Sequence, residues 1–198
     1  MADLSQAEFA RLARGGDIKE GSTPAADVVL GISSTSHAAI RRVHNESPSR
    51  ARAVLAGKLR RFLLAGGRAA ETAGRYRDCV ESYILWDGEG ASAVETPAKG
   101  QAVTFNGSSV RARPDVVIGD EETGEYEARV LLWDDLPLDR NSAELIALPV
   151  VERVEDTYGH GKVSVVKVFH LVTGRLEEVS PNTARGRRSD VEALLASV

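Results

Sequence analysis

Two short segments in the middle of the chain carry the residue types and spacing that phosphate chemistry needs. Asp115 follows Pro114 at the start of one apolar run, and Glu127-Ala128-Arg129 lies in the next. Two carboxylates on neighbouring strands can hold Mg²⁺ or Mn²⁺, because these ions prefer oxygen ligands. Such an ion would polarise a phosphate and lower the pKa of a bound water, and a nearby cation would stabilise the developing charge. The sequence therefore predicts Asp115 and Glu127 as metal ligands, with Arg129 contacting the phosphate.

The alternation of side chains along a strand decides which residues can meet. Glu127 and Arg129 share one face of their strand, while Ala128 and Val130 share the other. An acidic turn joins this strand to the one that begins at Asp115. We expect the turn to bring Asp115 beside Glu127, with Arg129 one pleat further along. A simpler interpretation stays open, in which Glu127 and Arg129 are a solvent-facing pair on an edge strand.

The first part of the chain has helical periodicity. Ser5 and Glu8 have capping-box spacing, and Ser47-Pro48 supplies an N-cap and an N1 proline for a helix that stops at Gly66-Gly67. Residues 1–66 are therefore predicted to form a helical N-terminal extension. The expected helices cover residues 5–14, 36–43, 48–65 and 69–85.

After Asp87-Gly88 the periodicity is typical of strands, and Asn106-Gly107 is a strong hairpin signal. An amphipathic helix is predicted from 141 to 158, kinked or broken near Pro149. Ser189 and Glu192 are expected to cap a closing helix. Strands are expected at 91–96, 101–105, 108–113, 115–118, 125–133, 162–171 and 176–180. The order predicts a mixed α/β (α+β) fold for residues 67–198, with a central mixed sheet flanked by helices.

In this order of elements, Pro114-Asp115 and Glu127-Ala128-Arg129 resemble the PD-(D/E)XK nuclease superfamily, the restriction-endonuclease-like fold, and its RecB-like branch. That family places Pro-Asp on one strand and an acid, any residue and lysine on the next. The resemblance extends from residue 69 to about residue 180. It implies an αβββαβ core and Mg²⁺- or Mn²⁺-dependent hydrolysis of nucleic acid. It also implies an acid from the preceding helix at the metal, for which Glu81 is preferred to Glu71.

The chain departs from the family pattern at two points. Arg129 replaces the motif lysine, and arginine stays protonated, so it can bind phosphate but cannot act as a base. The helix from Asn141 lacks the glutamine-to-tyrosine motif of many RecB-like nucleases. Three functions stay open: a divergent nuclease, a catalytically inactive fold that binds nucleic acid or protein, and a structural protein. In the last, the stripe of Val54, Leu59 and Phe62 would mediate a homo-oligomer or dock on another chain.

Charge is unevenly distributed along a chain whose net charge is −4. Eight basic residues and one acid lie between Arg41 and Arg68, whereas nine acids and one basic residue lie between Asp115 and Asp139. Such a division suits an enzyme acting on a polyanion. Arg50, Lys58 and Arg61 are predicted to contact the nucleic-acid backbone, unless they merely form a solvated helix face.

Several classes of protein are excluded or made improbable by composition. Cys79 is the only cysteine, so neither an intramolecular disulfide nor a thiolate zinc site can form. No phosphate-binding glycine loop and no Gly-x-Ser-x-Gly elbow occurs. Because we find no signal-peptide or membrane-spanning pattern, we expect a cytoplasmic protein without a membrane partner. The composition, rich in Ala, Arg and Val and poor in Lys, is typical of a GC-rich bacterial genome, and defence and DNA repair are both compatible roles.

Overall fold

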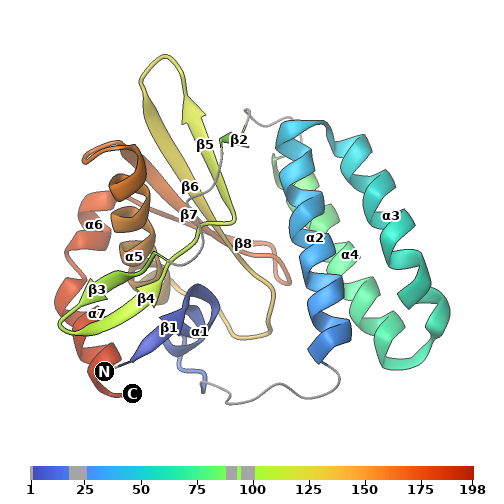
Figure 1. The fold of residues 1–198 in the computed structure, drawn as a ribbon, viewed down its shortest axis with the longest axis horizontal. Coiled ribbons are helices and arrows are strands. Elements are labelled where there is room, and N and C mark those ends of the chain that lie inside the picture. The colour runs from blue at the N-terminus through green and yellow to red at the C-terminus, as the bar shows by residue number, and fades with distance from the viewer. Residues whose placement is uncertain (1, 18–25, 88–92, 95–100) are drawn as a thin grey trace. The chain divides into compact units, whose positions relative to one another are not determined.

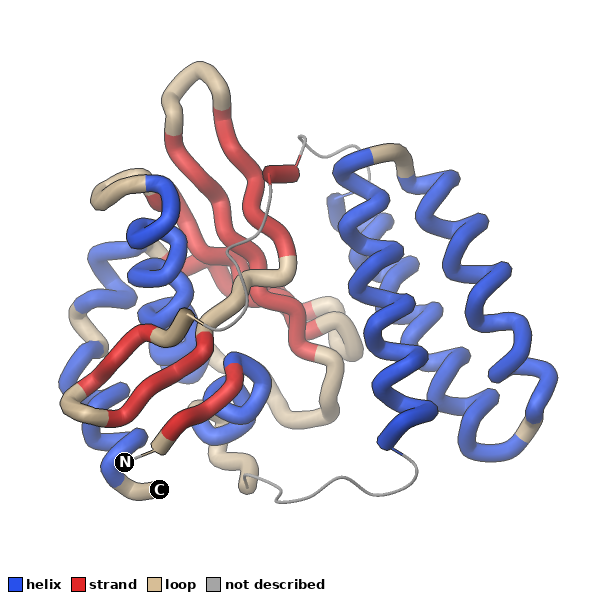
Figure 2. The backbone as a smooth tube through the Cα atoms, viewed as in Figure 1, coloured by secondary structure: helices blue, strands red, loops and turns tan. Residues whose placement is uncertain are grey.

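The structure, a computed structural model, describes residues 2–17, 26–87, 93–94 and 101–198. Its elements belong to two compact units, a helical unit and an α/β unit (Figures 1 and 2). The helical unit contains α2 (Ala26–Asn45), α3 (Pro48–Ala65) and α4 (Gly67–Asp87). The α/β unit contains α1 (Gln6–Leu12) and the elements from β3 onwards. The predicted boundary at residue 66 thus falls between α3 and α4, which belong to the same unit.

The helical unit is a bundle in which α2, α3 and α4 each pack against the other two. Leu55 and Leu59 of α3 and Tyr83 of α4 are fully buried in it, because they repeat at helical spacing on the inward sides. Gly66 and Gly67 connect α3 to α4 with φ values of 70° and 57°, a backbone conformation that favours glycine. No helix in the described part of the chain is long and apolar enough to cross a membrane.

The second helix is much longer than predicted, since α2 runs from Ala26 to Asn45 rather than over 36–43. The hydroxyls of Ser34, Thr35 and Ser36 can compete with a helix for backbone hydrogen bonds, which disfavours a helix interior. Here each hydroxyl donates to the carbonyl oxygen of Gly31 or Ile32, three or four residues earlier, at 2.9–3.2 Å. The hydroxyls are thereby satisfied within the helix.

The larger sheet of the α/β unit has the strand order β2-β5-β6-β7-β8. β5 and β6 form an antiparallel hairpin, β6 and β7 run parallel, and β7 and β8 are antiparallel, so the sheet is mixed. The strands are β2 (Ala93–Val94), β5 (Val116–Asp120), β6 (Glu125–Leu132), β7 (Val163–His170) and β8 (Arg175–Val179). The predicted strand at 91–96 lies largely outside the described residues.

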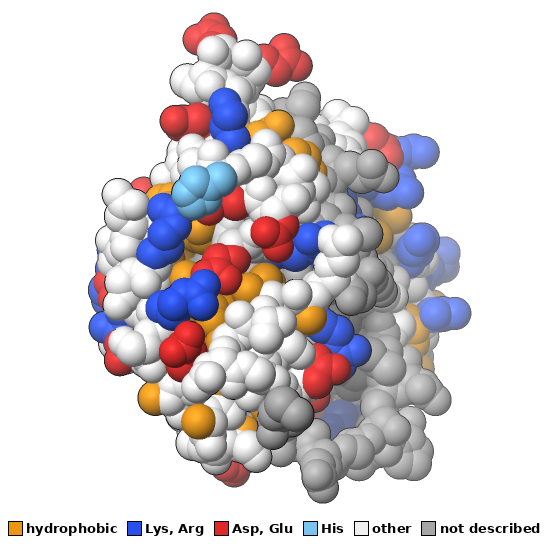
Figure 3. All heavy atoms as spheres, turned by 60° about the vertical axis from the view of Figure 1, so that its left-hand side comes forward, with side chains coloured by type: hydrophobic (Ala, Val, Ile, Leu, Met, Phe, Trp, Pro, Cys, Tyr) orange, Lys and Arg blue, Asp and Glu red, His pale blue; other side chains and the backbone are white. Residues whose placement is uncertain are grey.

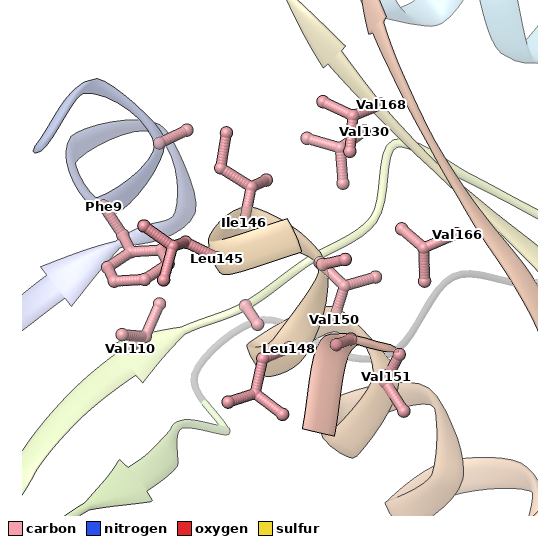
Figure 4. Packing of buried hydrophobic residues seen from close by; sticks show 14 of the residues in the cluster. Phe9, Val110, Val130, Leu145, Ile146, Leu148, Val150, Val151, Val166 and Val168 are labelled. Carbon is pink, nitrogen blue, oxygen red and sulfur yellow. The ribbon is translucent and has the colours of Figure 1, made fainter. Parts of the chain in front are cut away.

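The long helix α5 (Arg140–Tyr158) makes the crossover between the parallel strands β6 and β7 and packs on one face of the sheet. Ile146 and Val150 meet Val130, Val166 and Val168 in the main hydrophobic core (Figure 4). Asp139 caps the helix by accepting a hydrogen bond from the Ser142 amide at 2.7 Å. A kink or a break was predicted near Pro149, and the break does not occur, since α5 is one continuous helix through this buried proline.

A smaller mixed sheet, with the order β1-β4-β3, completes the α/β unit. Asn106 (φ 45°) and Gly107 (φ 87°) form the predicted hairpin turn between β3 (Val103–Phe105) and β4 (Ser108–Arg111). The sequence did not indicate β1 (Asp3–Ser5), which runs parallel to β4. Ser5 then caps α1 in the predicted capping box with Glu8.

The C-terminal segment forms two helices rather than one. Ser180 caps the short helix α6 (Pro181–Arg185), which the sequence analysis did not anticipate. α7 (Arg188–Ala196) begins one residue before Ser189, so the predicted cap by Ser189 and Glu192 is wrong. Its N-cap is Arg187, whose side chain makes no capping hydrogen bond.

Candidate functional site

Glu127 and Arg129 lie on β6, in the interior of the larger sheet. β6 pairs with β5 on one side and with β7 on the other, so the interpretation as an edge-strand pair is wrong. Alternation holds as expected, because Ala128 and Val130 belong to the hydrophobic core on the α5 side. Glu127 and Arg129 therefore lie on the opposite face, and Arg129 is only 3% exposed.

The carboxylate of Glu127 lies between two cations. The Arg129 Nε donates to its Oε1 at 2.5 Å, and the Lys167 Nζ lies 2.7 Å from its Oε2. All three side chains are at least four-fifths buried, with exposures of 20%, 4% and 19%. A carboxylate in this position neutralises two buried positive charges, which would each be costly alone.

Lys167 is the residue of this cluster that the sequence analysis missed. It lies on β7 directly across from Arg129, while its neighbour on β8 is Glu178, whose Oε1 is 3.7 Å from the Lys167 Nζ. No local sequence motif predicts this contact, because the whole of α5 lies between β6 and β7 in the sequence. Alternation along the predicted strand 162–171 limits the Lys167 side chain to one of two faces of the sheet. Only the register of β7 against β6 shows that it lies beside Arg129.

Asp115 lies at the other end of the β5–β6 hairpin. Its amide donates to the Arg129 carbonyl oxygen at 2.8 Å, and its Oδ2 accepts a hydrogen bond from the Leu131 amide at 2.8 Å. The residue opposite Glu127 is Ile118, three positions beyond Asp115. At about 3.3 Å per residue, Asp115 and Glu127 are roughly 10 Å apart along the strands. The expectation that the turn brings them side by side is therefore wrong, since Arg129 lies between them.

The predicted third acid belongs to the helical unit. Glu81 lies on α4 and accepts two hydrogen bonds from the Arg52 Nε, at 2.9 and 3.1 Å. Glu71 is exposed on the same helix. The sequence placed Glu81 on a helix before the strands, and this part of the prediction agrees with the structure.

The donor set does not fit a shared metal ion as the residues stand. Mg²⁺ binds oxygens at about 2.1 Å, so two of its ligands must lie within a few ångströms of each other. Asp115 and Glu127 lie roughly 10 Å apart along the strands, and both Glu127 oxygens already contact a cation. Within the described ranges, no group of three or more His, Cys, Asp or Glu side chains is arranged to hold a metal.

The three predicted backbone-binding residues are all exposed on α3, but their surroundings differ. Arg50 is 3.4 Å from Glu46, which also binds Arg42 at 3.1 Å. Lys58 forms no ion pair with a described residue, and the Arg61 guanidinium lies over the ring of its neighbour Phe62. By contrast, acidic and basic side chains are interspersed over the surface of the α/β unit seen in Figure 3.

The apolar stripe proposed as a docking surface is mainly internal. Leu59 is 1% exposed in the core of the helical unit, and Val54 and Phe62 are half-buried. His44 is buried, and its Nε2 lies 2.7 Å from the hydroxyl of the fully buried Tyr83. His160 is solvated, with a side chain that is 87% exposed.

Arg14 forms a second charged contact that the sequence analysis missed. It donates to both oxygens of Asp134, at 2.7 and 2.8 Å, and so fixes α1 to the end of β6. Burial raises the pKa of Asp134, but the hydrogen bonds and the charge of Arg14 outweigh burial and hold the pKa below its usual value. The backbone carbonyl of Asp134 also contacts the His170 Nε2 at 2.8 Å. These contacts stabilise the fold.

Comparison of the sequence with protein-family models and with curated proteins found no match. The assignment of function consequently depends on the fold and on the contacts described above.

Proposed function

We propose that the chain is a divergent restriction-endonuclease-like domain that binds nucleic acid without metal-dependent hydrolysis. The topology supports the first part of this proposal. A helix is followed by short strands, the β5–β6 hairpin, the crossover helix α5 and the parallel strand β7. Pro114-Asp115 precedes one strand of the hairpin, and Glu127-Ala128-Arg129 lies on the other, as in the family pattern.

The second part of the proposal, the absence of metal-dependent hydrolysis, is supported by the hydrogen bond from the Leu131 amide to Asp115. This hydrogen bond identifies Leu131 as the residue of β6 beside the motif aspartate. A second carboxylate ligand would have to stand at this position, and the leucine side chain offers no donor atom. The carboxylate that is available, Glu127, lies further along the strand and neutralises Arg129 and Lys167. The arrangement therefore favours a retained fold with a site that has lost its metal chemistry.

A cleavage assay tests the proposal. Wild-type protein is incubated with labelled single- and double-stranded DNA and RNA in Mg²⁺, Mn²⁺ or chelator, and gel shifts are recorded on the same samples. We expect binding without turnover under every condition. Asp115→Ala is compared with Asp120→Ala, which removes an exposed carboxylate at the tip of the same hairpin. Metal-dependent cleavage that disappears in Asp115→Ala and persists in Asp120→Ala would show that the proposal of an inactive site is wrong.

One observation favours an active metal-dependent nuclease as the second candidate. The Lys167 Nζ lies 2.7 Å from Glu127, so a lysine is present beside the motif acid although Arg129 occupies the motif position. A lysine at this place can contact a phosphate, and unlike arginine it can lose its proton. If cleavage is observed and Lys167→Met abolishes it, this candidate replaces the first. Arg175→Met, which changes an exposed cation on the next strand, serves as the control.

A further inference from the structure

Seven of the basic residues of the helical unit form two contrasting groups. Arg42, Arg50 and Arg52 are each paired with a carboxylate, at 3.1, 3.4 and 2.9 Å respectively. Lys58, Arg60, Arg61 and Arg68 are exposed and form no ion pair with any residue that the structure describes. The second group lies in the later turns of α3 and the first turn of α4, which are joined by Gly66. We name these four residues the α3–α4 basic corner.

The charges of this corner are not compensated by an ion pair with any described residue. α3 contains five basic residues and no acid, so no side chain of its own compensates them. Arg68 stands in the first turn of α4, which holds no acid, and a cation there opposes the helix macrodipole. Uncompensated like charges repel each other, so this arrangement favours an external polyanion.

Sterically, the outward side of α3 allows a close approach. Ala53, Ala56 and Gly57 are exposed there, and a Cβ atom added to Gly57 would meet nothing within 4 Å. The apolar residues Leu55 and Leu59 point into the bundle instead. A helix that inserts into a membrane surface needs bulky apolar side chains on its exposed side. Leu64, which is 75% exposed, supplies only one such side chain on α3, so phosphate groups of nucleic acid fit better than a lipid surface.

The kind of nucleic acid follows from the side chains that are missing at this surface. Proteins that prefer single strands stack the bases on exposed aromatic rings. Among the described residues, the large hydrophobic side chains that are exposed are Leu64, Leu85, Val172 and Val198, none of them aromatic. Contacts from lysine and arginine to phosphates carry no sequence information.

We infer that the α3–α4 basic corner binds the phosphate backbone of double-stranded nucleic acid, independently of sequence. This inference rests on the proposed function and assigns its binding surface. It replaces Arg50, which is already paired with Glu46, by Arg60 and Arg68 in the set of contacting residues. Each cation that contacts a phosphate releases a counterion, so the binding must be strongly salt-dependent.

Fluorescence anisotropy on the full chain tests the inference. Wild-type protein is titrated into labelled duplex and single-stranded DNA and RNA of equal length, at about 50 and about 200 mM salt. The test variant is Lys58→Gln, Arg60→Gln, Arg61→Gln and Arg68→Gln combined, because glutamine has nearly the helix propensity of the residues replaced. The control, Arg111→Gln, Lys162→Gln and Arg175→Gln combined, removes exposed cations from the α/β unit. Circular dichroism confirms folding, and the four single variants provide a graded series.

We expect the wild type to bind duplexes more tightly than single strands. The combined variant should weaken duplex binding at least tenfold and reduce the slope of log K against log salt by about one unit for each cation that contacts a phosphate. The control should keep the wild-type slope.

A combined variant that binds like the wild type would overturn the inference while leaving nucleic-acid binding intact. Preference for single strands would overturn the duplex assignment. Binding of the wild type to labelled anionic vesicles, titrated in the same way, instead of to nucleic acid would overturn the choice of partner. A wild type that binds no nucleic acid would overturn the proposed function as well.

Discussion

Basic side chains have opposite surroundings in two regions of this protein. On β6 and β7, Arg129 and Lys167 are buried and share the carboxylate of Glu127. On α3, Lys58 and Arg60 are exposed and meet no carboxylate of the described residues. The neutralised charges link neighbouring strands through one carboxylate, whereas the uncompensated ones are available to a partner. The comparison teaches that the local supply of acids, rather than the number of cations, distinguishes a structural charge from a binding surface.

The largest effect is expected when the sheet loses its carboxylate. Glu127→Gln removes the carboxylate that the buried Arg129 and Lys167 share, so the free energy of unfolding should fall by about 3 kcal/mol. Urea unfolding followed by Trp133 fluorescence, in a Trp86→Phe background, reports on the α/β unit separately. Glu178→Gln is the matched control, because Glu178 is 57% exposed and 3.7 Å from Lys167. It should cost less than about 0.5 kcal/mol. Equal losses in the two variants would contradict the structural role of Glu127.

A smaller, pH-dependent effect on stability is expected from the ion pair of Arg14 with Asp134, in contrast to the exposed cations. Because the pKa of Asp134 is lowered in the folded protein, its contribution is present above the unfolded pKa of about 3.9 and is lost as pH falls through the folded pKa. Asp134→Asn should therefore reduce stability at neutral pH by about 1–2 kcal/mol and flatten the acid limb of the stability curve. Thermal unfolding between about pH 2 and 7 measures this difference. An unchanged acid limb would show that Arg14 does not stabilise the ionised carboxylate.

Tyr83→Phe tests whether the helical unit depends on an internal polar contact rather than on its surface charges. The substitution keeps the buried ring but removes the hydroxyl that lies 2.7 Å from the His44 Nε2. We expect a loss of about 1 kcal/mol in the free energy of unfolding, measured by circular dichroism at the helix signal. Tyr76→Phe, in which the ring is half-buried on the same helix, is the comparison. A greater loss in that variant would contradict the assignment.

The smallest change is expected where the charges are uncompensated. Lys58→Gln, Arg60→Gln and Arg61→Gln together should alter the free energy of unfolding by no more than about 0.5 kcal/mol, because exposed residues that form no ion pair with a described residue contribute little. Any gain would come from relief of repulsion on α3. The measurement is urea unfolding followed by circular dichroism at the helix signal. A loss above about 1 kcal/mol would mean that these residues stabilise the bundle, which would remove the contrast with β6 and β7.

The sequence predicted well those features that depend on neighbouring residues. The capping box of Ser5 and Glu8, the N1 proline at Pro48 and the Asn106-Gly107 turn all appear where expected. Each is a local matter of backbone conformation and hydrogen bonding. The predicted start of α2 was less accurate. Its serine and threonine hydroxyls donate hydrogen bonds to backbone carbonyl oxygens within the helix, so they do not interrupt it.

The site was predicted only in part, because its geometry depends on pairings between distant segments. The residue types and the alternation around Glu127 and Arg129 could be inferred from the sequence. The register of β5 against β6 could not, and a shift along the strand separates Asp115 from Glu127. Lys167 enters the cluster through the pairing of β6 with β7, which no sequence pattern specifies. Strand register is fixed by the packing of a whole face, so its prediction requires the complete sheet.

The pairing of β1 with β4 has a consequence for the order in which the chain folds during synthesis. The Ala2 amide bonds the Ser108 hydroxyl across 106 residues, and α2, α3 and α4 lie between these partners in the sequence. The bundle consists of consecutive helices and can fold as soon as they leave the ribosome. The first strand must wait, unpaired, until residues beyond 100 have been translated. A slow stretch of translation between these two points would prolong the exposure of Leu4 and Phe9, which are buried in the finished protein.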